Sequence, residues 1–176
     1  MAALSSTGVR ADPLQGFNFL ISLVDVTSTA DLLKSEALSA AADVALGGFS
    51  ECTGLEMTMA VHDYAEGGNN GGTLHFPAPV KWANIALKKG LGASTALWDW
   101  HYGFVVGTGT RRDGVITLMD GQHVPSAIWY FKKGLPVKYS GPAMNASNSA
   151  VAVESIEIAH EGIYQLPGVA GGAGLA

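Results

Sequence analysis

The chain has 176 residues and a net charge of −5, with 48% hydrophobic and only 14% charged residues. This length suits one domain that buries its own core. The negative charge argues against sequence-independent binding of nucleic acid, which depends on basic residues that neutralise phosphates. Charged residues make up about 25% of an average soluble protein, so their scarcity here indicates that partners cover much of the surface.

The cysteine content and the first residues indicate in which cellular environment the protein folds. Cys52 is the only cysteine, so no intrachain disulfide forms, and the fold tolerates a reducing cytoplasm. A small buried hydrophobe is its expected role. Residues 1–10 lack the basic start and apolar run of a secretion signal, and no stretch approaches the ~20 apolar residues of a membrane span. We therefore expect no direct membrane insertion, and export only as part of an assembly.

In chain order, residues 1–16 are expected to form a loose N-terminal arm, and residues 17–24 a first strand with alternating apolar side chains. The Ala-rich stretch 25–47 follows, where Ser28 or Thr29 could cap a helix. Its apolar stripe consists mostly of small side chains and would bury little area. We interpret 25–47 as an insertion, either a loop or a short helix that packs on a neighbouring subunit.

A second strand is predicted from Leu55 to Val61, because apolar and polar residues alternate there with a period of two. One face of this strand should be buried and the other wet. Helix propensity alone would favour a helix at this place, but the alternation and the flanking glycines favour a strand. The strand leads into a glycine- and asparagine-rich loop over 66–72, whose residues adopt positive φ at little steric cost.

After this loop, Leu74 to Phe76 can resume a strand, which Pro77 and Pro79 restrict to an edge or an end. Residues 82–88 alternate again. An amphipathic helix is then predicted over 95–106, with Ser94 or Thr95 as its cap.

Three further strands are predicted at 115–119, 127–132 and 151–160, with Asp120-Gly121 as the turn between the first two. In the last strand, the apolar residues change face near Glu154-Ser155, which predicts a bulge there. Residues 163–176 are expected to form a C-terminal tail. The fold class is therefore mainly β: one domain over 1–176, a small antiparallel β-barrel or sandwich of about six strands with one flanking α-helix.

The sequence offers no constellation for catalysis, and we expect no enzyme, no cofactor and no metal. The five histidines are scattered, without the spacing of a metal site. Glycines 67–72 lack the Gly-Lys-Ser/Thr of a phosphate loop. Glu154 and Glu157 would face opposite sides of a strand, so we do not expect them to act as a paired general acid and base. The four tryptophans fit core and interface positions.

Four stretches, taken in order, carry a resemblance to a known family. They are FSECTGLE followed by DYAEGGNN (within 48–70), WANIALKKG (82–90), ALWDW (96–100) and VAVESIEIAHEG (151–162). Together they resemble the phage-type tail tube proteins of contractile phage tails and contractile injection systems, and they cover most of the chain. Each stretch alone is short and has an ordinary structural explanation. The resemblance is specific because all four stretches occur in the same order. The 25–47 insertion departs from the short turn of this family.

The resemblance implies a small barrel flanked by a helix, six copies of which form a ring. Such homo-hexameric rings would stack into the rigid inner tube of the machine. A sheath protein would surround the tube, baseplate and cap proteins would contact it, and protein or DNA cargo would occupy its lumen. The chain would then be cytoplasmic at assembly, and later part of a phage tail or injection-system particle, extracellular or cell-anchored.

Two sets of residues are candidates for this role. The loop expected to contact the next ring, because a long flexible loop needs a neighbour to order it, consists of Glu66, Gly67, Gly68, Asn69, Asn70, Gly71 and Gly72. The residues expected to line the lumen, as the wet face of the central strands, are Glu56, Thr58, Glu154 and Glu157. A mildly acidic wall would let acidic cargo slide without sticking.

Two alternatives are open at this point. The chain could form the baseplate ring that initiates the tube, which the unusual insertion favours. It could instead be a small β-barrel enzyme or ligand-binding module with the tryptophans around a pocket, although no site residues converge in the sequence.

Overall fold

The structure is a computed structural model, and it describes residues 14, 16–24, 48–68, 71–147 and 149–167. Most of the expected N-terminal arm, the 25–47 insertion, Asn69, Asn70 and the last part of the C-terminal tail lie outside this range.

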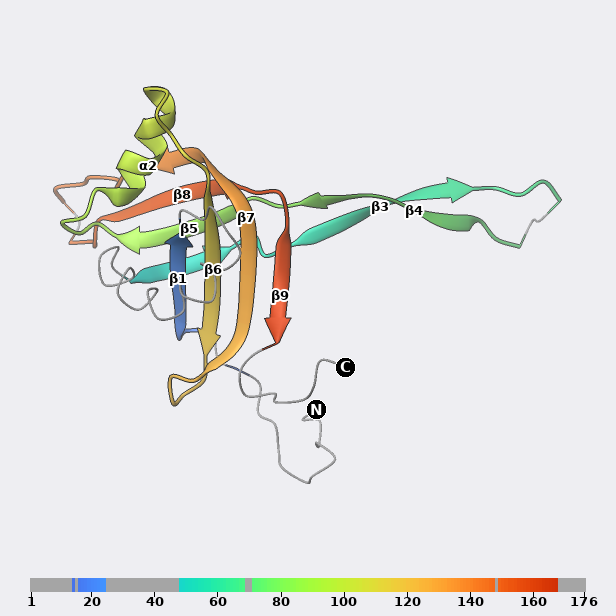
Figure 1. Cartoon of the computed structure of the whole chain (residues 1–176), viewed down its shortest axis with the longest axis horizontal. Coiled ribbons are helices and arrows are strands. Elements are labelled where there is room, and N and C mark those ends of the chain that lie inside the picture. Colours follow the sequence, from blue (N-terminus) through green and yellow to red (C-terminus); the bar gives the residue numbers. More distant parts are fainter. Residues whose placement is uncertain (1–13, 15, 25–47, 69–70, 148, 168–176) are drawn as a thin grey trace.

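The described residues form nine strands and one helix, in keeping with the expected mainly β fold (Figure 1). Their order along the chain is β1 (Phe19–Val24), β2 (Phe49–Thr53), β3 (Met57–Tyr64), β4 (Leu74–Trp82), β5 (Ile85–Gly90), α2 (Ala96–Val105), β6 (Arg112–Met119), β7 (Pro125–Ser140), β8 (Val153–Ala159) and β9 (Ile163–Pro167). The short strands β2 and β9 raise the number above the expected six. The expected C-terminal tail, residues 163–176, begins with β9, which pairs along β7.

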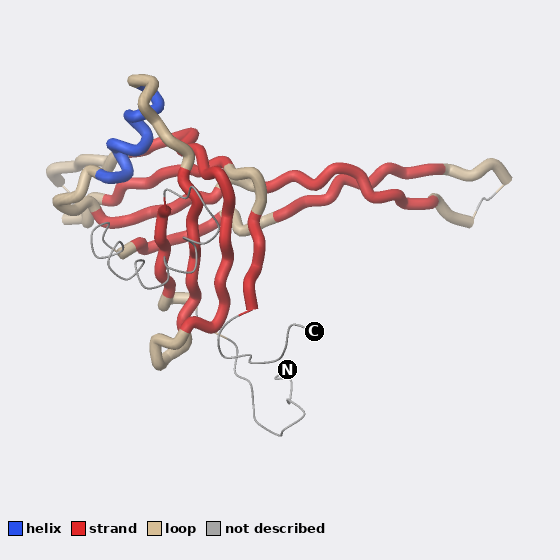
Figure 2. Tube along the Cα trace, in the orientation of Figure 1, coloured by secondary structure: helices blue, strands red, loops and turns tan. Residues whose placement is uncertain are grey.

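Seven strands form an antiparallel sheet in the order β1-β6-β7-β8-β5-β2, with β9 added beside β7, and β3 and β4 form a separate two-stranded ribbon. The sheet folds over on itself because β7 takes part in both layers (Figure 2). Residues 125–134 of β7 pair with β6, and residues 135–140 pair with β8.

The bend in β7 depends on Gly134. The register shifts on β7 opposite Asp113, and Lys133 there adopts a φ of 51°. A Cβ on Gly134 would lie 2.7 Å from the Arg112 carbonyl oxygen and 2.8 Å from the Phe131 ring. Such approaches are too short for any side chain, so a glycine is required where the two layers join.

The core lies between the two layers and under α2. Its buried residues are Ile21, Ile85, Leu87, Leu97, Trp100, Ile116, Phe131, Ile156 and Ile158. The predicted helix is confirmed. The indole of Trp100, in the middle of α2, donates a hydrogen bond of 2.9 Å to the Thr110 carbonyl oxygen in the segment that follows the helix.

The bulge predicted near Glu154-Ser155 is wrong. β8 pairs with β5 in an unbroken register from Val153 to Ile158, and the irregularity lies across from it in β7, between Pro136 and Lys138. The prediction failed because the inward face of β8 begins with Glu154, a buried charged residue. An apolar pattern does not recognise such a residue as part of the core.

Candidate functional site

The most conspicuous feature of the molecule is the ribbon formed by β3 and β4, residues 57–82. It projects away from the body of the protein as an extended arm, with residues 65–68 and 71–73 at its far end (Figure 1). Both prolines of β4 fit this position, since a strand in a two-stranded ribbon has one side without a strand partner.

The ribbon exposes a series of large apolar side chains. Every residue of β3 is exposed, with Met57 at 72%. The prediction of one buried and one wet face for this strand is therefore wrong for the single chain. The large apolar residues that lie in solvent along the ribbon are Met57, Met59, Val61, Tyr64, Leu74, Phe76 and Val80. Contiguous exposed apolar surface of this kind marks an interaction site.

Two contacts near the tip stabilise the ribbon itself. The His75 Nδ1 and Asp63 Oδ1 atoms lie 2.6 Å apart, and the rings of Tyr64 and Phe76 meet edge to face with centroids 6.3 Å apart. Both are cross-strand contacts, which hold the two strands in register.

The body holds the root of the ribbon through His160. Its Nε2 lies 2.9 Å from the Ala83 carbonyl oxygen, and its ring packs against Trp82 at a centroid distance of 6.2 Å. Burial lowers the pKa of His160, although nearby backbone carbonyls oppose the shift. The imidazole is therefore neutral at pH 7, and Nε2–H donates to Ala83.

The predicted ring-contact loop lies at the far tip of the ribbon. Glu66, Gly67, Gly68, Gly71 and Gly72 are all exposed there. Gly68 has a φ of 89°, so the turn uses the positive φ that the sequence indicated. Asn69 and Asn70, which belong to the same prediction, lie outside the described residues.

The predicted lumen residues separate into two groups. Glu56 and Thr58 are exposed at the root of the ribbon, and Glu157 is half-buried beside Lys138, with Nζ and Oε1 2.9 Å apart. Glu154 is only 2% exposed. A residue that lines a lumen must be open to solvent in the single chain, so the assignment of Glu154 is wrong.

Glu154 belongs instead to a buried polar cluster. Its Oε1 lies 3.3 Å from Lys89 Nζ, whose side chain is also 2% exposed, and its Oε2 accepts a hydrogen bond of 2.7 Å from the Tyr139 hydroxyl. Burial, together with this bond to a carboxylate, raises the pKa of Tyr139 to about 12. No local pattern indicates this pairing, because Lys89 and Glu154 come from strands far apart in the chain.

A group of mostly basic residues lies where β7 bends, and no sequence pattern indicated it. We use "the corner" for Arg111, Arg112, Asp113, Lys132, Lys133 and Glu161. Glu161 pairs with Arg111 at 3.0 Å and with Lys133 at 2.9 Å, and the Lys132 ammonium lies over the rings of Tyr130 and Tyr164. Four basic and two acidic residues leave this corner with a net positive charge in an otherwise acidic chain.

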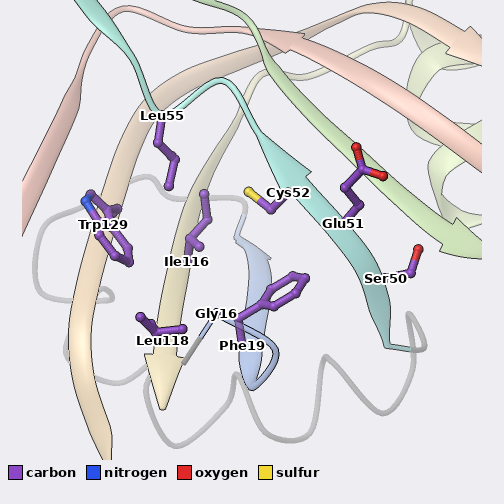
Figure 3. A pocket seen from close by; sticks show the side chains of 9 residues that line it. All are labelled: Gly16, Phe19, Ser50, Glu51, Cys52, Leu55, Ile116, Leu118 and Trp129. Atoms are coloured by element: carbon purple, nitrogen blue, oxygen red, sulfur yellow. The ribbon is translucent and has the colours of Figure 1, made fainter. Parts of the chain in front are cut away.

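One pocket of about 290 Å³ opens between the facing edges of β1 and β2 (Figure 3). Phe19, Leu55, Leu118 and Trp129 give it a mostly apolar lining, and Cys52 points into it. Burial raises the pKa of the Cys52 thiol to about 11, so the thiol stays protonated at neutral pH and is a poor nucleophile. Ser50 and Glu51 complete the lining. The Ser50 hydroxyl donates to the Lys88 carbonyl oxygen, and the Glu51 carboxylate pairs with Lys88 Nζ at 2.9 Å.

No helix among the described residues is long and apolar enough to cross a membrane. No group of three or more His, Cys, Asp or Glu among them could hold a metal ion.

Known structures share this fold. A chain of the anti-feeding prophage baseplate matches with a TM-score of 0.72 and 18% identity, over 89% of this chain and 97% of that one. A chain of the PVC sheath-tube complex, from an extracellular contractile injection system, matches with a TM-score of 0.69 and 19% identity, over 88% and 92%. A chain of the anti-feeding prophage tube-terminating cap matches at 0.70 and 18%, over 89% and 93%.

The sequence matches none of the curated proteins. It does match a family model, that of the T4-like virus tail tube protein gp19, and the match runs over residues 15–164. Because this range contains all but the two ends of the chain, the protein belongs to the T4-like virus tail tube protein gp19 family.

Proposed function

We propose that identical copies of this chain assemble into six-membered rings that stack into the rigid inner tube of a contractile phage tail or injection system. The observation that carries this proposal is the ribbon, whose large apolar side chains project into solvent far from the body. A monomer gains nothing from such a surface, whereas an assembly buries it.

The edges of the folded sheet support the same conclusion. In the described part of the chain, β2 pairs with β5 alone and β9 with β7 alone. Each therefore presents an outer row of backbone groups to a further strand. A ring of copies satisfies such edges without leaving a free end, through heterologous contacts that close by rotation.

The remaining parts of the machine follow from the family. A sheath protein would surround this tube, and baseplate and cap proteins would meet its ends, as the similar chains come from sheath-tube, baseplate and cap assemblies. Protein or DNA cargo would pass along the lumen. The particle would assemble in the cytoplasm and act outside it or anchored to the cell. The function is then mechanical and not catalytic.

Glu56, Thr58 and Glu157 are the proposed lumen residues, since all three are at least partly open to solvent. A Glu56→Lys variant would test the acidic wall, with Lys81→Arg as a charge-conserving control, since Lys81 lies directly opposite Thr58. We expect the Glu56 variant to load or eject less cargo. Unchanged loading and ejection would remove Glu56 from this role.

Expression of the chain, followed by sedimentation velocity and negative-stain microscopy, tests the central proposal. We expect rings or stacked tubes of uniform diameter. A chain that stays monomeric at all concentrations, including in the lysate of cells that make the complete particle, would refute it. The number of copies per particle separates a tube body, with many rings, from a baseplate initiator with one.

A further inference from the structure

The ribbon is joined to the body at a break in strand pairing. β2 pairs with β5, and β3 pairs with β4, but residues 54–56 and 83–84 between them belong to neither ladder. Among the described elements, β3 and β4 make extensive contact only with each other. Residues 54–56 and 83–84 therefore form a joint about which the ribbon can turn, and we call them the joint.

The two connections of the joint lie close together. Gly54 has a φ of 89°, and a Cβ there would lie 2.0 Å from the Asn84 carbonyl oxygen, so only glycine fits. The Ala83 N–H donates a hydrogen bond of 3.2 Å to the Glu56 carbonyl oxygen. Neither contact lies in a strand ladder, so neither fixes the angle of the ribbon as a continuous sheet would.

His160 fastens this joint to the body. Its Nε2–H donates to the Ala83 carbonyl oxygen at 2.9 Å. Its ring lies beside that of Trp82, at a centroid distance of 6.2 Å, and beside that of Phe131 in the core, at 6.0 Å. The imidazole thus connects the last residue of the ribbon to the core, and we call His160 with Trp82 and Ala83 the latch.

The other nitrogen of this ring suits a neutral imidazole alone. His160 Nδ1 is buried and has no hydrogen-bond partner among the described residues. The carbonyl oxygen of Gly162, in the turn that follows β8, already accepts a bond of 3.2 Å from the Lys132 N–H. A proton on Nδ1 would place an N–H and a positive charge at this buried position, which is costly without an acceptor. The charged ring regains hydration if it leaves the latch.

No charged side chain offsets this cost. The charged residues on the elements around the latch are Glu56, Lys81, Lys132, Lys133 and Glu161, and all five are exposed to solvent. Glu161 is already paired with Lys133 and Arg111. The pKa of His160 responds first to burial, which lowers it, and then to the carbonyls of Ala83 and Gly162, which raise it less.

We propose that the latch is an acid-sensitive switch: protonation of His160 releases the root of the ribbon, which then turns about the joint while the body stays folded. The switch is a property of the single chain and does not rest on the proposed function. Its consequence is that the ribbon leaves the body in one direction at neutral pH and in many directions in acid.

The direction of the pH effect follows from linkage. The latched imidazole has a pKa below 6.5, and a released imidazole in water has the ordinary value. Below about pH 6.5 the released form therefore binds a proton that the latched form does not. Each further pH unit favours release by at most about tenfold, until the pKa of the latched form is reached.

Hydrogen exchange measured by mass spectrometry tests the release. The full chain is diluted until sedimentation velocity shows single copies, and exchange of residues 82–85 is followed at about pH 7.5 and about pH 5.5. After correction for the intrinsic effect of pH, we expect exchange at Ala83 to be about threefold to tenfold faster at the lower pH. Circular dichroism and unchanged exchange in β6 and β8 should show that the body remains folded.

Two glutamine variants identify the titrating group. His160→Gln keeps a donor for Ala83 but does not titrate, so its corrected exchange should be the same at both pH values, whatever its level. His75→Gln is the control, because it removes the other histidine contact of the ribbon, the pair with Asp63 near the tip, and should respond to pH like the wild type. A wild-type joint that does not respond to pH, or an equal response in His160→Gln, would overturn the switch. Simultaneous loss of protection in β6 and β8 would show acid unfolding in its place.

The direction of the ribbon is measured between two spin labels, at Glu66→Cys near the tip and at Gln122→Cys in the turn between β6 and β7. Both positions are exposed, and Cys52→Ser removes the only native cysteine. We expect one narrow distance distribution at about pH 7.5 and a broad one at about pH 5.5, and a narrow distribution at both values would overturn the turning motion. These measurements use single copies, so a chain that never forms rings would refute the proposed function and leave this switch intact.

Discussion

The imidazole of His160 is hydrogen-bonded to the carbonyl oxygen of Ala83, with Nε2 2.9 Å from the oxygen. Ala83 follows the last residue of β4, and His160 follows the last residue of β8. The bond therefore joins the root of the ribbon to the end of β8 in the body. The direction in which the ribbon leaves the body therefore depends on a histidine that burial keeps neutral.

His160 should make folding sensitive to acid. Its pKa in the folded chain lies below the ordinary value of 6.5, so below about pH 6.5 the unfolded chain binds a proton that the folded chain does not. The free energy of unfolding should then fall as the pH drops below that value. His160→Gln keeps an amide donor for Ala83 but does not titrate. Urea unfolding at about pH 7.5 and about pH 5.5 should show a smaller loss in this variant than in the wild type, and equal losses would contradict the assignment.

The buried pair of Lys89 and Glu154 should tolerate joint replacement better than single replacement. Lys89→Met alone leaves a buried carboxylate without its cation, which costs about 3–5 kcal/mol. Lys89→Met combined with Glu154→Gln removes both charges and should recover much of that loss. Urea unfolding of Lys89→Met, Glu154→Gln and the double variant measures this difference. A double variant that loses as much as the sum of the two single losses would show that the two side chains are not coupled, and would contradict this expectation.

Gly134→Ala tests the bend of β7. A methyl group there would meet the Arg112 carbonyl oxygen at 2.7 Å and the Phe131 ring at 2.8 Å, so we expect a loss of about 2 kcal/mol or more in the free energy of unfolding. Gly141→Ala is the matched control, since a Cβ there meets only the Tyr139 ring at an ordinary 3.9 Å. Equal stability of the two variants would mean that the bend does not need a glycine.

The parts of the fold that the sequence predicted are those that this chain buries by itself. Ile85, Leu87 and Leu97 follow the periods of a strand and a helix, and all three lie in the core. Residues 120–124 join β6 and β7, so Asp120-Gly121 lies in the turn as expected, but the turn is longer than two residues and its positive φ is at His123. In these cases local pattern and burial in the single chain agree.

The wrong predictions of burial and exposure have two physical causes. Met57 and Met59 alternate like residues of a half-buried strand, yet both are exposed in the single chain, because the alternation does not specify which molecule covers them. Glutamate is a residue type that is usually exposed, and the burial of Glu154 depends on Lys89, its partner on another strand. Local sequence patterns specify neither how far the ribbon projects from the body nor which distant strands pair with each other.

The loop at the tip of the ribbon should matter for assembly and not for folding. A chain that lacks residues 66–72 keeps the whole core, because the described residues of this segment, 66–68 and 71–72, lie at the far end of the ribbon from it (Figure 1). We expect it to melt at the same temperature as the wild type, but to form rings or short stacks in place of long tubes. Gly67→Ala is the control, since a Cβ at Gly67 has no atom within 4 Å and its φ is not in the positive range. Long tubes of normal length from the deletion variant, seen by negative-stain microscopy, would assign the contact between rings to another surface.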